Sequence, residues 1–487
     1  MSASREELLP ILGRRNAGTP QGTGLGARHL VAFMLFLCLA VAYALRVILS
    51  VAIVAMCRDC GDDKDINDDF PAYDWSSKKD TILSSFFWGY VVTQVPGGIV
   101  AQRVGGAPLL VASLGLTSAV SLLTPLAADG GWGWMCAGRV VQGLAQGLVF
   151  PSVHTLLAKW SPPDERGRLA TYVYAGAQVG TIVAMASSGA LAASAIGWPS
   201  IFYIFGSVGV AWAVLWFFLG GNSPATHRWC SERERTYIEE SLGDTSAIVR
   251  PPTPWGKIMT SVPMWSLIIV HCGQNWGFWT LLTEMPSYMN SVLGFELSKN
   301  GLLSALPYFV MWILSFVFSW TSDFANKKQW LKLTTSRKLF NTIGHWGPAC
   351  ALLGVGYVEE KASAVALLTV AVGLDAATYV GFQVNHIDLS PNFAGSMMGV
   401  TNCAANIMSI IGPLLVGVLV PPEEQSNPEA WRVVFFLASG IYFVGNLLFV
   451  IFGSAELQPW NTPRETRGND EEKPTEKSEQ DGNENSS

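Results

Sequence analysis

Long apolar segments follow one another along most of this chain, and each is long enough to cross a lipid bilayer. A helix needs about 20 mainly apolar residues to span a hydrocarbon core about 30 Å thick. Half of the 487 residues are hydrophobic and only 14% are charged, whereas soluble domains carry about 25% charged residues. The alternating pattern of a membrane β-barrel is missing, so we expect helices and exclude a soluble enzyme.

Twelve membrane spans are predicted. They cover residues 29–56, 79–102, 107–128, 132–157, 170–193, 200–220, 263–286, 300–322, 338–358, 362–388, 394–419 and 430–455. The longest polar break, residues 221–260, has six spans on each side and is predicted to be a linker. We therefore expect an all-α membrane protein with two six-helix bundles, residues 29–220 and 261–455, and polar tails at residues 1–28 and 456–487.

Two polar stretches outside the spans have local signatures of their own. Ser231 and Glu234 in the linker have capping-box spacing, which predicts the start of a short helix. The charge run around them is typical of a solvated helix. The tail from Glu456 is acidic and contains proline, so we expect it to be disordered.

The distribution of positive charge predicts the orientation of the chain. If both termini are cytoplasmic, 22 of the 31 Lys and Arg residues lie on the cytoplasmic side and five lie in the opposite loops. Cytoplasmic loops of membrane proteins carry an excess of Lys and Arg, so we expect both termini in the cytoplasm. The aspartate-rich loop 57–78 then faces the exterior or an organelle lumen, where a disulfide between Cys57 and Cys60 is possible.

Two arginines lie where the bilayer disfavours charge. Arg46 is about 17 residues into the first span and has no acid in that span, and Arg139 begins the apolar part of the fourth span. A charge at bilayer depth costs about 2.5–3.5 kcal/mol on insertion scales, so such residues normally face a wet cavity and a partner. Because a guanidinium fork suits carboxylate and phosphate oxygens, we expect both arginines to bind an anion. A structural ion pair is the alternative for each.

The two halves carry a faint internal repeat. The loop GGIVAQRVGG follows the second span, and SWTSDFANKK follows the eighth. Aligning the two places Gln102 opposite Asp323, with Arg103 and other basic residues close by. Such a repeat is typical of a duplicated transporter.

The sequence resembles the anion:cation symporter branch of the major facilitator superfamily, which contains type I sodium/phosphate cotransporters, sialin and the vesicular glutamate transporters. Four stretches carry the resemblance: YALRVILSVAIVAM, SSFFWGYVVTQVPGG, RVVQGLAQGLVFPSVHTLLAKWSPPDERGRLA and NHIDLSPNFAGSMMGVTN. The likeness covers residues 29–460 and is strongest to sialin and to inorganic phosphate cotransporters of invertebrates. It implies two bundles related by a pseudo-twofold axis.

The resemblance also implies which residues surround the substrate and which couple or gate transport. Substrate-binding candidates, besides Arg46 and Arg139, are Tyr43, Phe86, Phe87, Tyr90, Tyr174, Gln178 and Asn275. Coupling and gating candidates are Arg103, Gln146, Asp323, Asn385, His386 and Asp388. His386 is the best titratable candidate, because imidazole changes charge near neutral pH. Side chains two apart diverge on a helix, so His386 and Asp388 are not a catalytic dyad.

Departures from the family pattern narrow the range of expected substrates and coupling ions. Gln146 stands where sialin and the glutamate transporters have a glutamate, which removes a proton-carrying carboxyl. Leu83 and the stretch Gly273-Gln274-Asn275 replace basic residues of the glutamate transporters, which disfavours glutamate. Asp375 is an extra acid in the tenth span that could pair with an arginine, bind a cation or face a wet cavity.

We therefore expect a secondary active transporter that works by alternating access. Its leading substrate is inorganic phosphate, coupled to sodium rather than protons because of Gln146. A proton-coupled transporter of an organic anion, such as sialic acid, and a non-transporting anion sensor of the same fold are the alternatives. No resident cofactor, metal, catalytic residue or nucleic-acid partner is expected, since no zinc, nucleotide or nucleophile motif and no basic stripe are present.

The partner and location of such a protein follow from the same reasoning. We expect a monomer embedded in the bilayer that binds one small anionic substrate. Both the plasma membrane and an endolysosomal or vesicular membrane fit the sequence.

Overall fold

The computed structural model describes residues 26–57, 71–242, 253–358, 360–390 and 393–461. Within these ranges the side chains at positions 95, 102, 163–168, 297–298, 327 and 395 are not described. The described chain is helical apart from its connections and an isolated bridge between Cys57 and Tyr73.

Each of the twelve predicted spans coincides with a helix or a helix pair. The first six are α2 (Ala27–Met56), α3 (Lys79–Val104), α4 (Gly106–Asp129), the pair α5 (Trp132–Gln146) and α6 (Val149–Trp160), α7 (Pro163–Ala192) and α8 (Pro199–Leu219). The last six are α11 (Val262–Ser291), α12 (Leu297–Lys327), α13 (Leu333–Val355), the pair α14 (Lys361–Asp375) and α15 (Phe382–Leu389), α16 (Ala394–Leu419) and α17 (Pro428–Phe452). By length and composition, nine spans in the described part of the chain can cross a membrane, and α3, α11 and α13 are the more polar remainder.

Short helices connect the spans. They are η3 (Ser76–Lys78), η4 (Pro224–Thr226), α9 (Glu232–Leu242), α10 (Trp255–Met259), η5 (Ala376–Tyr379) and η6 (Pro422–Glu424). Of these, η5 interrupts the tenth span between α14 and α15.

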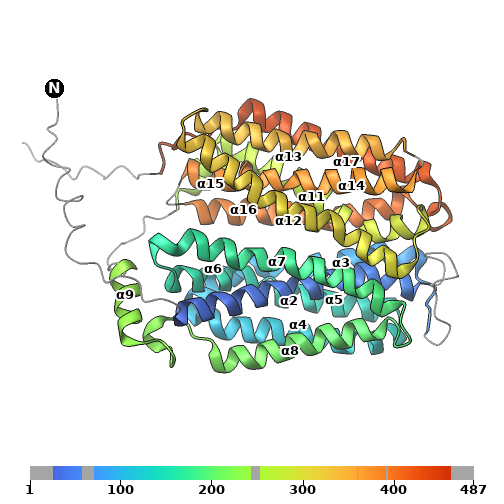
Figure 1. Ribbon diagram of the computed structural model, residues 1–487, viewed down its shortest axis with the longest axis horizontal. Coiled ribbons are helices and arrows are strands. Elements are labelled where there is room, and N and C mark those ends of the chain that lie inside the picture. The colour runs from blue at the N-terminus through green and yellow to red at the C-terminus, as the bar shows by residue number, and fades with distance from the viewer. Residues whose placement is uncertain (1–25, 58–70, 243–252, 359, 391–392, 462–487) are drawn as a thin grey trace, which may run out of the picture.

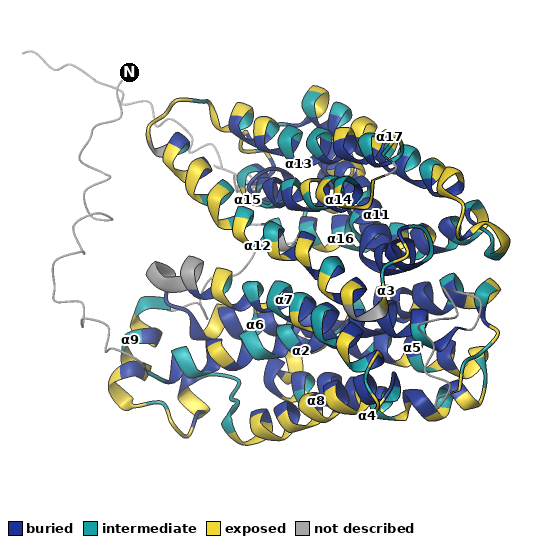
Figure 2. Ribbon diagram, turned by 45° about the vertical axis from the view of Figure 1, so that its right-hand side comes forward, coloured by how far each residue is buried: buried dark blue, intermediate teal, exposed yellow. Residues whose placement is uncertain are grey.

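The spans form two groups that lie side by side with their axes roughly along one direction (Figure 1). One group contains α2 to α8, and the other contains α11 to α17. Exposed residues follow the outward faces of both groups (Figure 2). Many of them are large and apolar, such as Leu123 on α4, Phe217 on α8 and Phe316 on α12. Such a surface suits lipid, because an exposed apolar side chain costs nothing in a hydrocarbon solvent.

Glycines bring α2 and α7 into backbone contact. A Cβ atom at Gly176 would collide with the carbonyl oxygen of Phe36, and one at Gly180 would collide with that of Ala40. Gly143 on α5 makes an equally close approach to the backbone of Phe86 on α3. Small residues at such positions let membrane helices pack closely, so the first group is held together by backbone contact as well as by side chains.

The linker helix α9 is attached to the first span, which differs from the solvated helix expected from its charge run. Ser231 caps α9 as predicted, since its Oγ accepts from the Glu234 N–H at 3.3 Å. The Glu234 carboxylate, however, accepts hydrogen bonds from the backbone N–H groups of Ala27 at 2.8 Å and of Arg28 at 3.0 Å. It also pairs with the Arg28 guanidinium at 3.0 Å, and both side chains are buried. Glu234 therefore caps α2, where a negative charge is stabilised by the N-terminal end of the helix.

The expectation that the chain is disordered from Glu456 onward is wrong for residues 456–461. Trp460 is buried and its ring lies 6.3 Å from that of Phe393. Ser390 donates a hydrogen bond to the Asn461 side chain at 2.7 Å. A single buried indole anchors this segment against α15 and α16, whereas residues 462–487 lie outside the described part.

Replacing Glu234 should destabilise the protein because it leaves Arg28 buried without a carboxylate. We expect Glu234→Ala to cost about 3 kcal/mol or more, the usual effect of breaking a buried ion pair. The measurement is the thermal unfolding midpoint in detergent. Glu239→Ala on the same helix removes an exposed pair with Arg235 and should shift the midpoint little; equal shifts for the two variants would contradict this role of Glu234.

Candidate anion site between the two helix groups

Arg46 on α2 is held by a neutral partner. Its Nε and Nη2 donate to the Gln146 Oε1 at 3.2 and 3.0 Å. The Gln146 amide nitrogen in turn donates to the carbonyl oxygen of Ala42 at 3.0 Å. Arg46 is 6% exposed and Gln146 is fully buried. The amide thus fixes the direction of the guanidinium without neutralising its charge.

Aromatic rings surround the Arg46 guanidinium. Its Cζ lies 4.8 Å from the ring centroids of Tyr43 and Phe86, 4.7 Å from that of Tyr90 and 5.3 Å from that of Trp279. Trp279 comes from α11, so the second helix group contributes to the surroundings of this arginine. The negative ring faces attract the cation, which lowers the cost of keeping it away from water.

Arg139 on α5 lies against the same ring of Phe86, with 4.9 Å from its Cζ to the centroid. Its Nη2 donates to the carbonyl oxygen of Arg46 at 3.2 Å, and its Nη1 donates to Gln142 Oε1 at 3.1 Å. The buried Nε of Arg139 has no hydrogen-bond partner among the described residues. Both guanidinium groups therefore contact the same phenyl ring, and Arg139 retains an unused donor.

No described carboxylate pairs with either arginine. The described hydrogen-bond and ring partners of Arg46 and Arg139 are all neutral, namely amide oxygens, a backbone carbonyl and aromatic side chains. Two like charges in a low-dielectric interior repel each other, and an anion that approaches both relieves that repulsion. The arrangement suits a multiply charged oxyanion, which accepts several charge-assisted hydrogen bonds at once.

The other predicted substrate residues spread outward from this point. Phe87 packs edge-on against Trp279, with 4.9 Å between centroids. Tyr174 lies beyond Phe150, which separates it from Tyr43, and its hydroxyl contacts the His154 ring at 2.9 Å. These residues form a partly buried aromatic path along the first helix group, and their contact with substrate stays a prediction.

Two predicted residues join the helix groups or stabilise the second one. Gln178 on α7 donates to the hydroxyl of Tyr379 on η5 at 2.8 Å, so it bridges the two groups. Asn275 on α11 donates to the Ser409 hydroxyl of α16 at 3.1 Å. The hydrogen bonds of both residues go to groups other than the two arginines.

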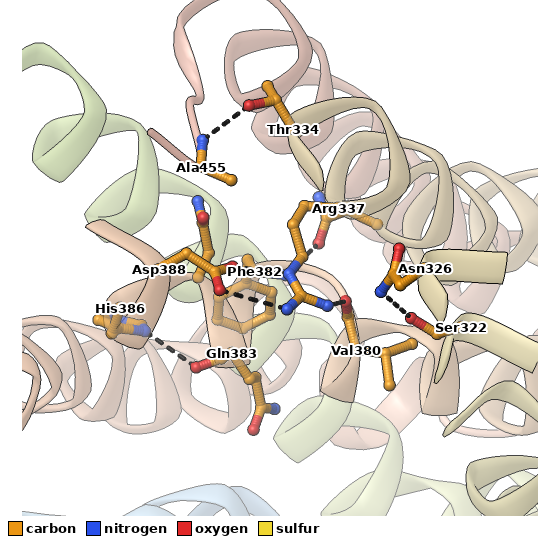
Figure 3. Close-up of polar contacts among 12 residues, drawn as sticks. Ser322, Asn326, Thr334, Arg337, Val380, Phe382, Gln383, His386, Asp388 and Ala455 are labelled. Carbon is orange, nitrogen blue, oxygen red and sulfur yellow. Dashed lines mark hydrogen bonds and ion pairs between the residues drawn. The ribbon is translucent and has the colours of Figure 1, made fainter. Parts of the chain in front are cut away.

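The predicted coupling residues of α15 form a separate cluster (Figure 3). His386 is buried, with Nε2 2.9 Å from the Thr401 hydroxyl and Nδ1 3.1 Å from the Gln383 carbonyl oxygen. Asp388 instead accepts from Arg337 Nε on α13 at 2.7 Å. The two side chains diverge, as expected from their spacing, and each ties α15 to a different neighbouring helix.

Asn385 anchors the same helix at another point, since its Nδ2 donates to the carbonyl oxygen of Ser454 at 3.0 Å. Arg103 and Asp323 are both exposed and are not brought into contact with the cluster. The Gln102 side chain lies outside the described residues. Arg103 and Asp323 therefore lie at the surface, and any gating role of the two stays a prediction.

A charged cluster that sequence reasoning missed joins the two groups at the end opposite α9. Lys79, at the start of α3, is 2% exposed. Its Nζ lies 3.5 Å from Glu284 Oε2 on α11, 3.1 Å from Ser287 Oγ and 4.0 Å from Asp80 Oδ1. Trp279 was missed as well. The sequence offered a lysine at the start of one span and a glutamate within another as signals. It did not reveal that the two side chains pair, because they meet only at the interface between the helix groups.

Comparison with known proteins agrees with this architecture. Solved structures with the same fold include a bacterial homologue of the human lysosomal transporter Spinster, with a TM-score of 0.65 at 15% identity, covering 89% of this chain and 99% of that one. The D-xylose-proton symporter gives a TM-score of 0.62 at 14% identity, over 88% of this chain and 98% of that chain. At these identities the likeness concerns the fold alone.

Relatives of known sequence are much more similar. A "Putative inorganic phosphate cotransporter" of Drosophila melanogaster is 42% identical over 92% of this chain and 88% of its own length. The human "Vesicular glutamate transporter 2" is 36% identical over 91% of this chain and 77% of its own length. Residues 35–413 match the Major Facilitator Superfamily. With twelve helical spans in its described part and two buried arginines near the interface of two helix groups, this chain belongs to the Major Facilitator Superfamily of membrane transporters and is not an enzyme.

Proposed function

We propose that this protein carries inorganic phosphate across a membrane together with sodium. The observation that supports an anionic substrate is the pair Arg46 and Arg139, whose described partners are all neutral. Phosphate offers several oxygen acceptors to the guanidinium forks and to the unused Nε of Arg139. The name of the Drosophila relative favours the same substrate.

The transport mechanism that we propose is alternating access. The two helix groups meet through Lys79 and Glu284 at one end, and Gln178 contacts Tyr379 nearer the middle. Rocking of one group against the other would break the contact between Lys79 and Glu284. The arginines would then be exposed at the Lys79 end. The substrate biases this equilibrium only through contacts that differ between the two states.

We further propose that both termini lie in the cytoplasm, in either the plasma membrane or an endolysosomal or vesicular membrane. The excess of Lys and Arg on the side of the linker supports this orientation. Cys57, at the other end of α2, is disulfide-bonded, while Cys60 lies outside the described residues. Disulfides persist in oxidising compartments, so this bond supports a position of that end outside the cytosol. In this orientation the Lys79 cluster joins the helix groups at the end that faces away from the cytoplasm. We also propose that the protein acts as a monomer.

Sodium is the proposed coupling ion because Gln146 cannot carry a proton. The amide carries no charge and binds no proton, so it cannot offset the positive charge of Arg46. A carboxylate there would neutralise Arg46 and would need a proton to release it for the substrate. The amide thus favours co-transport of the anion with a metal cation over co-transport with a proton.

Purified protein in liposomes should take up labelled phosphate when sodium is outside. We expect saturable entry that falls to background when sodium is replaced by choline at constant pH, because the sodium gradient supplies the driving force. Empty liposomes are the control. If phosphate entry is flat while an organic anion accumulates under an acid gradient, the substrate and the coupling ion are both wrong.

Arg46→Ala should abolish uptake, because it removes one of two cationic groups that face the anion. Arg46→Lys should retain only part of it, about a tenth or less, since an ammonium group cannot form the bidentate contact. Arg235→Ala, which alters an exposed arginine on α9, is the matched control. Normal uptake by Arg46→Ala protein at equal membrane expression would remove this residue from the site.

Gln146→Glu should make uptake depend on pH. The new carboxylate lies within 3.0–3.2 Å of Arg46 by analogy with the present amide oxygen, so it competes with the anion. We expect KM for phosphate to rise about tenfold at neutral pH and to recover as acid protonates the new side chain. Initial rates at several pH values measure this effect. Gln329→Glu at an exposed turn is the control, and an unchanged KM in Gln146→Glu protein would show that Gln146 does not govern the charge of Arg46.

A further inference from the structure

The tenth span is broken at a buried acid. α14 ends at Asp375, the 3-10 helix η5 covers Ala376–Tyr379, and α15 begins at Phe382. Interrupted helices near the middle of a transporter expose backbone dipoles, and coupling ions bind at such breaks. The position of Asp375 at the last residue of a half-helix therefore requires an explanation.

Asp375 has one neutral hydrogen-bond partner and no cationic partner among the described residues. It is 2% exposed, and its Oδ2 accepts a hydrogen bond from Gln274 Nε2 on α11 at 3.0 Å. Its Oδ1 is buried and has no partner among the described residues. Of the three possibilities that the sequence leaves open, pairing with an arginine is not observed in the described part of the chain. An isolated carboxylate in an apolar interior is costly, so the group must be neutralised.

The other buried acids of the described chain differ from Asp375 in this respect. Glu234 has the Arg28 guanidinium at 3.0 Å, and Glu284 has the Lys79 ammonium at 3.5 Å. Asp388, less deeply buried, has Arg337 at 2.7 Å. Each of these carboxylates is balanced by a lysine or arginine, whereas Asp375 is faced only by neutral groups.

Three tyrosines from different elements interact electrostatically with Asp375: Tyr308 on α12, Tyr379 on η5 and Tyr442 on α17. The Tyr308 hydroxyl is buried without a described partner, as is the Thr378 hydroxyl on η5. His345, a titratable group on α13, packs edge-on against Tyr442 with 5.5 Å between centroids. Hard cations prefer oxygen ligands, and a carboxylate is among the strongest of them.

The same turn is connected to the first helix group. Tyr379, four residues after Asp375, receives the hydrogen bond from Gln178 at 2.8 Å. Gln178 lies on α7, along the wall that contains the predicted substrate residue Tyr174. Asp375 is thus one 3-10 turn away from the contact between Gln178 and Tyr379. Alternating access must rearrange this contact, so a change of charge at Asp375 can affect it.

We propose that Asp375 is the binding site of the coupling cation, which delivers a single positive charge as Na⁺ or as H⁺. This inference rests on the proposed function and adds to it the residue at which the cation binds. Bound Na⁺ forms an ion pair with the Asp375 carboxylate, and H⁺ converts that carboxylate to a neutral carboxyl group. In both cases the acid becomes neutral before the helix groups rearrange, and it releases the cation on the other side.

The decisive variant is Asp375→Asn, which keeps the shape and can still accept a hydrogen bond from Gln274. Cation-driven accumulation of phosphate should fall by about tenfold or more, because a neutral amide binds neither cation. Counterflow, the exchange of labelled for unlabelled phosphate without a cation gradient, should stay within about twofold of wild type, because exchange does not require release of the cation. Asp74→Asn, at an exposed residue, is the matched control.

Two arms distinguish the cations. Replacing sodium by choline at fixed pH tests Na⁺, and imposing a pH gradient without sodium tests H⁺. In wild type, one of these gradients should drive accumulation, and neither should do so in Asp375→Asn protein. A folded variant that still accumulates phosphate with the same cation dependence overturns the proposal, and so does a folded variant that loses counterflow together with accumulation.

A binding measurement separates failure of this proposal from failure of the proposed function. The thermal unfolding midpoint of detergent-purified wild type should rise with sodium over choline, or change with pH, and that response should be absent in Asp375→Asn protein. If wild type carries no phosphate yet keeps this response, the phosphate assignment fails and the cation site stands. An identical response in the monodisperse variant would refute the cation site.

Discussion

The interior of this protein carries two guanidinium charges that none of the described carboxylates balances. Gln146 makes this arrangement possible, because its amide oxygen orients Arg46 while its nitrogen is tied to the carbonyl of Ala42. The rings of Tyr43, Phe86, Tyr90 and Trp279 then supply the electrostatic stabilisation that water would give elsewhere. The geometry is maintained by neutral groups, which leaves the charge available for an anion.

The anion site is also part of the interface between the helix groups. Trp279 belongs to α11 but contacts Arg46 on α2, and Tyr379 belongs to η5 but accepts from Gln178 on α7. A movement of one group against the other therefore changes the surroundings of Arg46 directly. Backbone contact at Gly176 and Gly180 makes internal rearrangement of the first group costly, so the interface is the natural place for movement.

The fold was largely predictable from sequence because a bilayer imposes a simple length and polarity rule. All twelve predicted spans match helices, and Arg46 was identifiable because charge in an apolar run is rare. Contacts between distant segments were not predictable. Nothing local indicates that Glu234 caps α2 rather than facing solvent, or that Lys79 and Glu284 pair from positions about 200 residues apart. Trp460 packs in what looked like a disordered tail, because one indole can outweigh a polar composition.

Two arginines with no carboxylate partner in the described part of the chain also make the empty protein electrically active. In a carrier that returns without substrate, the return step moves both guanidinium charges and the acid at Asp375. These charges move within the electric field of the membrane. One elementary charge crossing 100 mV corresponds to about 2.3 kcal/mol. The membrane voltage therefore acts on the unloaded protein as well as on the loaded one, and the neutral amide of Gln146 is what keeps that charge uncompensated.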